Sequence, residues 1–164
     1  MPTETTDPAE LTEQEMTQAL TAAAAIEAPT RAAAHHLLVN SGLPGRRAFA
    51  ACVELAEEAD KHSASGGTFL AAYVDWAALE SALPDLRLNS AKERLVRLAI
   101  GYATGKPVDV RDISAIGGHV HKRYIIEAAL IATGATQDEL YTLSEGPGLE
   151  RDGAFMRDLL GEAQ

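Results

Sequence analysis

The chain has 164 residues, of which 46% are apolar and 23% are charged, and its formal net charge is −10. This composition is typical of a soluble globular protein that is long enough to bury a core as one domain. The single cysteine, Cys52, excludes an intramolecular disulfide and a multi-cysteine zinc site, and no apolar run approaches the roughly 20 residues that span a bilayer. Residues 1–10 lack the basic and apolar regions of a secretory signal, so we expect a cytoplasmic protein.

Abundant alanine and scarce aromatic residues favour helices over a sheet. We therefore expect an all-α fold, a compact bundle of about six to eight helices in residues 9–145. A disordered acidic tail is expected at 1–8, and a linker with a short C-terminal helix at 146–164. The predicted helices span, in chain order, 9–27, 30–40, 44–62, 68–83, 90–104, 109–116, 119–133, 136–144 and 149–161.

Further local signals occur within and between these helices. Helix 44–62 has Cys52 on its apolar face, where we interpret the cysteine as a small buried hydrophobe. Residues 63–67 form the clearest internal break and are expected to separate an acidic N-terminal helical portion from the main helical unit. After this break, 68–74 also fits a short strand, but we assign the whole of 68–83 to a helix. A capping box of Ser90 and Glu93 is predicted to begin the next helix.

Basic residues are concentrated between Leu86 and Ile126, where eight Lys or Arg residues accompany only three acids. Charge segregated in this way indicates a surface for an anionic partner. Two arginines share the side of helix 90–104 opposite its apolar stripe, and a glycine pair precedes a basic first turn in helix 119–133. The candidate anion- or partner-binding residues are Arg94, Arg97, Gly117, Gly118, His119, Lys122 and Arg123.

From Tyr124 onward, helix 119–133 is apolar on nearly every side, which predicts a buried central helix that exposes only its first turn. Cations at a helix N-terminus face the positive end of the helix dipole, so an anion is expected close to them. The anion is either Asp109 together with Asp112, or a bound partner, and we favour the aspartates.

Motifs for catalysis and for metal binding do not emerge from the sequence. The glycine pair does not match a P-loop, no nucleophile elbow or His-Glu-x-x-His occurs, and His119 and His121 diverge on a helix. We expect no catalytic residue, no metal and no cofactor, and an enzyme is the less favoured reading. The predicted function is a non-enzymatic interaction or regulatory module that binds a protein or its own copy through segregated charge.

The alternative is a nucleic-acid- or nucleotide-binding regulator that uses the basic patch within 87–123. A short helix, a glycine turn and a basic second helix have the layout of a helix-turn-helix. However, the second helix becomes apolar after one turn, which leaves few positions for contacts with base edges.

Overall fold

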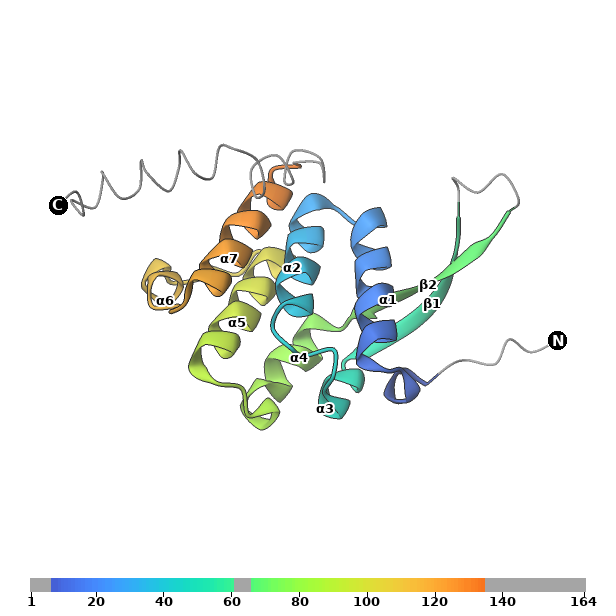
Figure 1. Ribbon diagram of the computed structural model, residues 1–164, viewed down its shortest axis with the longest axis horizontal. Helices are drawn as coiled ribbons and strands as arrows, with labels where there is room; N and C mark the ends of the chain where they lie inside the picture. The colour runs from blue at the N-terminus through green and yellow to red at the C-terminus, as the bar shows by residue number, and fades with distance from the viewer. Residues whose placement is uncertain (1–6, 61–65, 135–164) are drawn as a thin grey trace.

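The computed structural model describes residues 7–60 and 66–134, so residues 1–6 of the tail expected at 1–8, the linker at 146–148 and the helices expected at 136–144 and 149–161 lie outside it. The last two residues of the expected tail are ordered, because Asp7 caps η1 and Pro8 begins it. The described part is mostly helical but contains a two-stranded sheet, and the all-α prediction is therefore only partly correct (Figure 1). Its elements are η1 Pro8–Glu10, α1 Glu13–Ile26, α2 Pro29–Val39, α3 Arg47–Ala50, β1 Val53–Ala59, β2 Thr68–Val74, α4 Trp76–Ala82, η2 Leu83–Leu86, α5 Ser90–Thr104, α6 Val110–Ser114 and α7 His119–Ala132. None of these helices is long and apolar enough to cross a membrane.

The helix predicted at 44–62 is wrong over most of its length. The segment forms the single turn of α3 and then β1, which pairs with β2 in an antiparallel register from Val53↔Val74 to Ala59↔Thr68. Alanine and glutamate favour a helix in isolation, but β2 is rich in aromatic and aliphatic residues and supplies a pairing partner. Tertiary pairing thus overrides local propensity. Cys52 is buried as expected, but in the turn before β1.

The helix predicted at 68–83 is likewise wrong in its first half, where the strand alternative is correct. Asp75 separates β2 from α4 and caps the helix, because its carboxylate accepts hydrogen bonds from the amides of Ala77 and Ala78 at 3.0 Å. The break at 63–67 therefore lies between two paired strands instead of separating two helical units.

Most of the remaining described helices begin and end close to their predicted bounds, but α1 begins at Glu13, after the separate turn η1, and not at residue 9. A further difference lies at a helix cap. Asn89 begins α5, since its side chain accepts a hydrogen bond from the Lys92 amide at 2.9 Å, in place of the predicted pair of Ser90 and Glu93. Within α5, a Cβ at Gly101 would overlap the Val108 side chain. The glycine thus allows the segment that follows α5 to pack closely against the helix.

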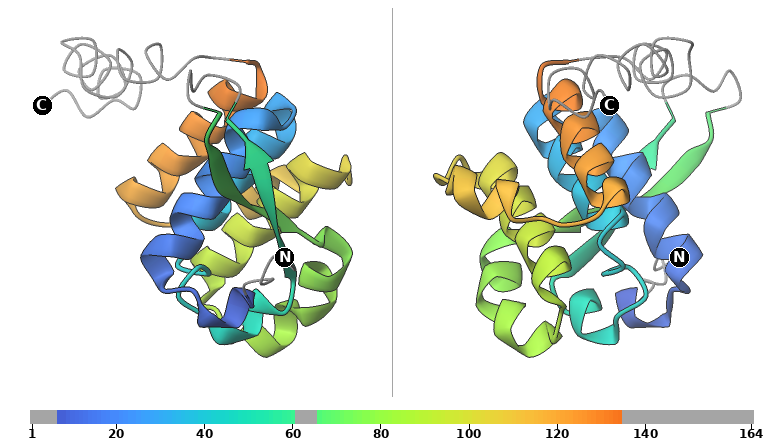
Figure 2. Two further views of the ribbon diagram at one scale, coloured as in Figure 1. Left: turned by 90° about the vertical axis from the view of Figure 1, so that its right-hand side faces the viewer. Right: turned by 60° about the vertical axis from the view of Figure 1, so that its left-hand side comes forward.

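The core is arranged in successive layers around α2. The hairpin of β1 and β2 packs against α1, α1 packs against α2, and α2 packs against both α5 and α7 (Figure 1). The buried side of α2 consists of Ala33, Ala34, Leu37 and Leu38, all fully buried. Consequently the hairpin and α7 lie on opposite sides of the α1–α2 pair (Figures 1 and 2).

The position of α7 differs most from expectation. The sequence predicts a buried central helix, but of the α7 side chains that the structure describes only Ala128 is fully buried, and Val120 and Ile126 are 59% and 62% exposed. One side of α7 packs on α2, while the described part of the chain places nothing on the opposite side. Apolar residues on every side of a helix permit its burial. Whether the helix is buried depends on how many other elements pack against it.

Candidate functional site

The two arginines predicted on α5 are paired within the chain. Arg94 donates a hydrogen bond from Nη1 to the Ala115 carbonyl at 2.9 Å, and its Nε lies 3.9 Å from Asp112 Oδ1. Arg97 Nη2 lies 2.8 Å from Glu93 Oε1 one turn earlier on the same helix. Both guanidinium groups therefore have partners within the chain.

The aspartates expected to neutralise the first turn of α7 are engaged with other arginines. Asp109 accepts a hydrogen bond from the Arg111 amide at 2.8 Å, which caps α6, and its Oδ2 lies 2.8 Å from Arg111 Nη2. These two contacts with Arg111 lower the pKa of the Asp109 carboxyl. Since Asp112 faces Arg94, the structure links these acids to α5 and α6.

A cleft of about 180 Å³ lies where α5 meets the segment that follows it. Its charged lining is mixed: Arg97 and Lys106 contribute positive charge, whereas Glu80, Asp109 and Asp112 contribute negative charge. Lys106 also forms an ion pair with Glu80 across the cleft. Because the acids match or exceed the bases, this cleft offers little attraction to a phosphate.

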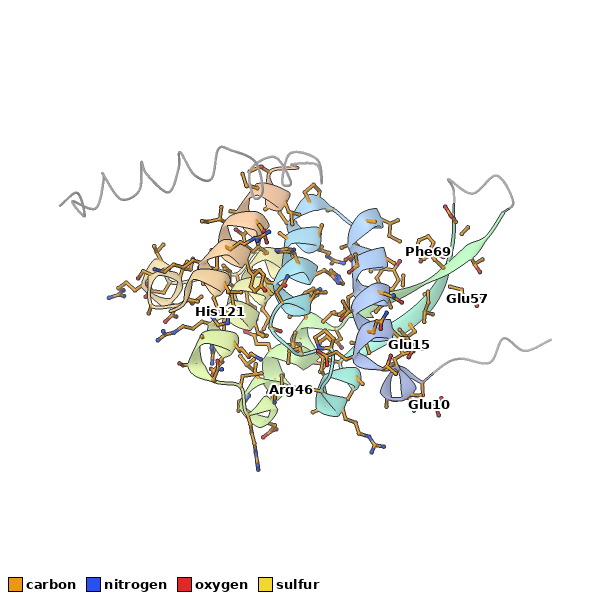
Figure 3. All side chains as sticks on the ribbon, in the orientation of Figure 1. Glu10, Glu15, Arg46, Glu57, Phe69 and His121 are labelled. Atoms are coloured by element: carbon orange, nitrogen blue, oxygen red, sulfur yellow. The ribbon has the colours of Figure 1, made fainter. Side chains whose placement is uncertain are left out.

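The glycine pair and the first turn of α7 form the second half of the predicted site. Gly118 begins α7 with a positive φ of 87° and provides no side-chain cap, and the Gly117 carbonyl lies 3.0 Å from His121 Nδ1. The backbone of α7 starts at His119, and Figure 3 labels His121 near this end of the helix. Lys122 is exposed, and no other described residue forms an ion pair with it.

Lys122 and Arg123 belong to the side of α7 that points away from α2, which we call the outward face. Residues on the opposite side, such as Tyr124, Ile125 and Ile131, pack against the core. At 100° per residue, the positions opposite the buried Ala128 gather on one side. The outward face consists of Lys122, Arg123, Ile126, Ala129, Leu130 and Thr133. It therefore has an apolar centre and a basic end.

A cluster that the sequence analysis did not identify joins α7 to α2. His36 Nε2 lies 3.0 Å from Glu127 Oε2, and Glu127 Oε1 accepts a hydrogen bond from Arg123 Nε at 2.6 Å. The His36 ring also stacks edge-on against Tyr124, with 6.2 Å between centroids. Burial lowers the pKa of His36, and Glu127 partly offsets this effect. Only the fold brings Glu127 to His36.

A second histidine–carboxylate contact lies on the other side of α2. His35 is 1% exposed, and its Nε2 lies 2.7 Å from Glu27 Oε2, although the pair lacks the alignment of a hydrogen bond. The His35 ring meets Trp76 edge-on at 5.7 Å, and burial lowers its pKa. Glu27 also pairs with Arg31 at 3.2 Å. The i, i+4, i+8 spacing of Glu27, Arg31 and His35 is a signal that could have indicated the cluster.

Neither histidine cluster has the composition of a metal site. Within residues 7–60 and 66–134, no three His, Cys, Asp or Glu side chains are grouped so that they could hold a metal ion. No protein-family model matches the sequence, and no curated protein or solved structure gives a significant match. The proposal for function therefore depends on the surface geometry alone.

Proposed function

We propose that this protein is a non-enzymatic interaction module that binds a protein partner through the outward face of α7. The observation that carries the proposal is the apolar centre of this face, in which Ile126 is 62% exposed, Ala129 is exposed and Leu130 is half-buried. Exposed apolar residues flanked by charged ones are typical of an interaction surface. A partner that covers them would remove this apolar area from water.

The charges at the basic end support the same assignment. Arg123 is held by Glu127, which fixes its position beside Ile126, while Lys122 extends from an exposed site. Charged residues at the rim of an interface steer partners and set the orientation of binding more than they add affinity. The outward face thus combines an apolar contact area with a basic orienting edge.

Site-specific photo-crosslinking tests the proposal. A photoreactive residue in place of Ile126 should form a covalent adduct with a protein partner in cells, and Leu130→Glu in the same chain should abolish that adduct. A photoreactive residue in place of Glu57, which is exposed on the hairpin across the molecule, is the matched control (Figure 3). Equal labelling from both positions, or labelling that survives Leu130→Glu, would contradict the proposal.

The alternative, a nucleic-acid- or nucleotide-binding regulator, has one observation in its favour. Lys122 is exposed at a helix N-terminus that begins with Gly118 and has no side-chain cap. Such a terminus presents backbone amides to an anion. If the alternative holds, binding to DNA, RNA or a nucleotide should weaken with added salt and with the double variant Lys122→Ala/Arg123→Ala.

A further inference from the structure

We infer that the outer edge of β1 binds an extended, basic segment of a protein partner, which pairs with β1 as a third strand of the sheet. The outer edge is the side of β1 opposite β2, and it is separate from the outward face of α7. The inference therefore does not depend on the function proposed above. It rests on backbone groups of β1 that have no partner in the described part of the chain, and on the charges beside them.

The hydrogen bonds of the hairpin determine which backbone groups of β1 point outward. The Asp75 amide donates to the Cys52 carbonyl and the Asp60 amide donates to the Gly67 carbonyl, both at 2.8 Å. Both bonds fit the register of the hairpin, and in an antiparallel pair such bonds join every second residue of a strand. The residues in between direct their amides and carbonyls away from β2, and they are Val53, Leu55, Glu57 and Ala59.

These outward groups form no hydrogen bond with any other residue of 7–60 and 66–134. Strand β2 packs against α1, and its Ala71 and Ala72 are fully buried, whereas the main neighbours of β1 are β2 and η1. Glu57 and Ala59 are exposed in the part of the hairpin that extends beyond the helices (Figures 1 and 3). An edge of this kind can accept a further strand through backbone hydrogen bonds.

The side chains of β1 select the class of partner. The strand carries Glu54, Glu57 and Glu58 and no basic residue. Tyr73 donates a hydrogen bond to Glu58 Oε1 at 2.7 Å, which holds this carboxylate on the hairpin. Opposite charges on neighbouring strands stabilise a sheet, and like charges directly opposite each other destabilise it. The added strand should therefore carry Lys or Arg opposite the glutamates.

The same charges disfavour this chain as its own partner. In an antiparallel pair of two β1 strands centred on Ala56, Glu54 of each copy would lie opposite Glu58 of the other. Residues 135–164 contain seven acidic residues and two arginines, so their net charge has the same sign as that of the edge. Most basic residues of the described chain lie on helices, whose backbone groups are already bonded within the helix. A different protein with a basic extended segment fits the edge best.

Antiparallel pairing fixes the spacing of the basic residues in the added strand. Position 1 of that strand is defined as the residue opposite Ala59. Positions 2 and 3 then lie opposite Glu58 and Glu57, and position 6 lies opposite Glu54. Positions 1, 3 and 5 exchange backbone hydrogen bonds with β1, because they lie opposite the outward residues Ala59, Glu57 and Leu55. The partner is therefore recognised by both its charge and its backbone.

Fluorescence anisotropy of a labelled synthetic peptide, titrated with the full chain at low salt, is the primary test. The peptide has seven residues, with lysine at positions 2, 3 and 6 and valine or threonine elsewhere. We expect saturable binding that Glu54→Gln/Glu57→Gln weakens by about tenfold or more. Glu13→Gln/Asp85→Asn is the matched control, because it removes two exposed acids outside the hairpin, and it should leave the affinity nearly unchanged.

N-methylation of the peptide distinguishes strand pairing from attraction between charges alone. A methyl group on the amide of position 3, which points toward β1, should weaken binding by about tenfold or more, because it removes a donor and keeps the strands apart. A methyl group on the amide of position 4, which points away from β1, should have a much smaller effect. Equal effects of the two methyl groups would contradict strand pairing. This comparison leaves the protein itself unchanged.

Amide hydrogen exchange, followed by NMR, locates the bound peptide on the chain. The peptide should slow exchange at Leu55, Glu57 and Ala59, whose amides point outward. It should have little effect at Glu54 and Ala56, whose amides already bond to β2. Protection that alternates along β1 is therefore the signature of an added strand, and protection confined to another element would overturn the inference.

Absence of peptide binding at low salt would also overturn the inference, as would binding that the double glutamine variant leaves unchanged. The crosslinking control at position 57 fits both proposals. Its photoreactive residue removes the Glu57 carboxylate, so labelling from that position should remain weaker than labelling from position 126. Loss of the adduct at position 126 would leave the binding of the peptide to β1 unaffected, and absence of peptide binding would leave that adduct unaffected. The two proposals therefore fail separately.

Discussion

Helices α5 and α7 have similar lengths and similar contents of apolar and basic residues, but they are used differently. In α5 the apolar side is buried, with Leu95, Val96 and Ala99 fully covered, and the arginines on the other side pair with acids of the same chain. In α7 one side is covered by α2, and the outward face exposes Ile126 beside Lys122.

The difference between α5 and α7 shows that the burial of a helix depends on the elements packed around it, and not on its own sequence pattern alone. Elements α2, α4, α6 and α7 all contact α5, whereas the main contact of α7 is with α2. A helix whose apolar outer side is left uncovered by the described residues can accept a further neighbour on that side. Helix α5 therefore serves the fold, and we assign the interaction to α7.

The largest predicted effect concerns apolar side chains on the two helices. Leu95→Ala on α5 should lower the free energy of unfolding by about 2–5 kcal/mol, because it leaves a cavity in the core. Ile126→Ala on α7 should change it by no more than about 0.5 kcal/mol, because the Ile126 side chain is 62% exposed. Urea denaturation of both variants measures the difference, and equal losses would show that α7 is covered after all.

The second prediction concerns two glycines. Gly101→Ala should destabilise the fold by about 1–2 kcal/mol, because the new methyl group overlaps Val108 and this cost exceeds the gain in helix propensity. Gly117→Ala should be nearly neutral, since its added Cβ would meet nothing within 4 Å. Thermal denaturation tests the pair, and Val108→Ala should partly rescue Gly101→Ala.

The third prediction compares two i, i+4 ion pairs, Arg123–Glu127 on α7 and Glu93–Arg97 on α5. Glu127→Ala on α7 should cost about 1–2 kcal/mol of unfolding free energy, because Glu127 is 14% exposed and its loss leaves His36 and Arg123 without this carboxylate. Glu93→Ala on α5 should cost about 0.3–0.5 kcal/mol, because the pair with Arg97 is exposed. Urea titrations of both variants at one pH decide the ranking, and a reversed ranking would contradict the role of Glu127.

The smallest predicted effect is a loss of stability in acid, which arises from the two histidines of α2, His35 and His36. Burial lowers the pKa of His35 and His36, so the unfolded chain binds protons more readily than the folded one. The free energy of unfolding should therefore fall as the pH decreases below the ordinary histidine value of about 6.5. Urea titrations at several pH values measure the slope, which His35→Gln/His36→Gln should flatten. A stability that rises on acidification would contradict the assignment.

Elements with strong local signals were predictable from the sequence. Proline at Pro29 and glycine at Gly134 bound their helices close to the predicted positions, and the break at Gly117–Gly118 separates α6 from α7 as expected. These boundaries depend on backbone chemistry within a few residues, so they need no knowledge of the rest of the fold.

The strands and the position of α7 depend on residues far away in the sequence. Glu54, Glu57 and Glu58 have helical spacing, and only pairing with β2 places them in a strand. The exposure of Ile126 likewise depends on which elements pack beside α7. Helix periodicity alone placed Lys122 and Arg123 on a first turn but could not reveal that Asp109 and Asp112 pair with other arginines.

The central position of α2 has a consequence for the order in which the protein folds. Two of its main neighbours, α5 and α7, follow it much later in the sequence, after the whole hairpin. A chain that is being synthesised therefore holds α1 and α2 together before it contains the helices that cover the rest of α2. The core is therefore complete only when α7 is present, and the contact of α7 with α2 closes a long loop whose entropy opposes it.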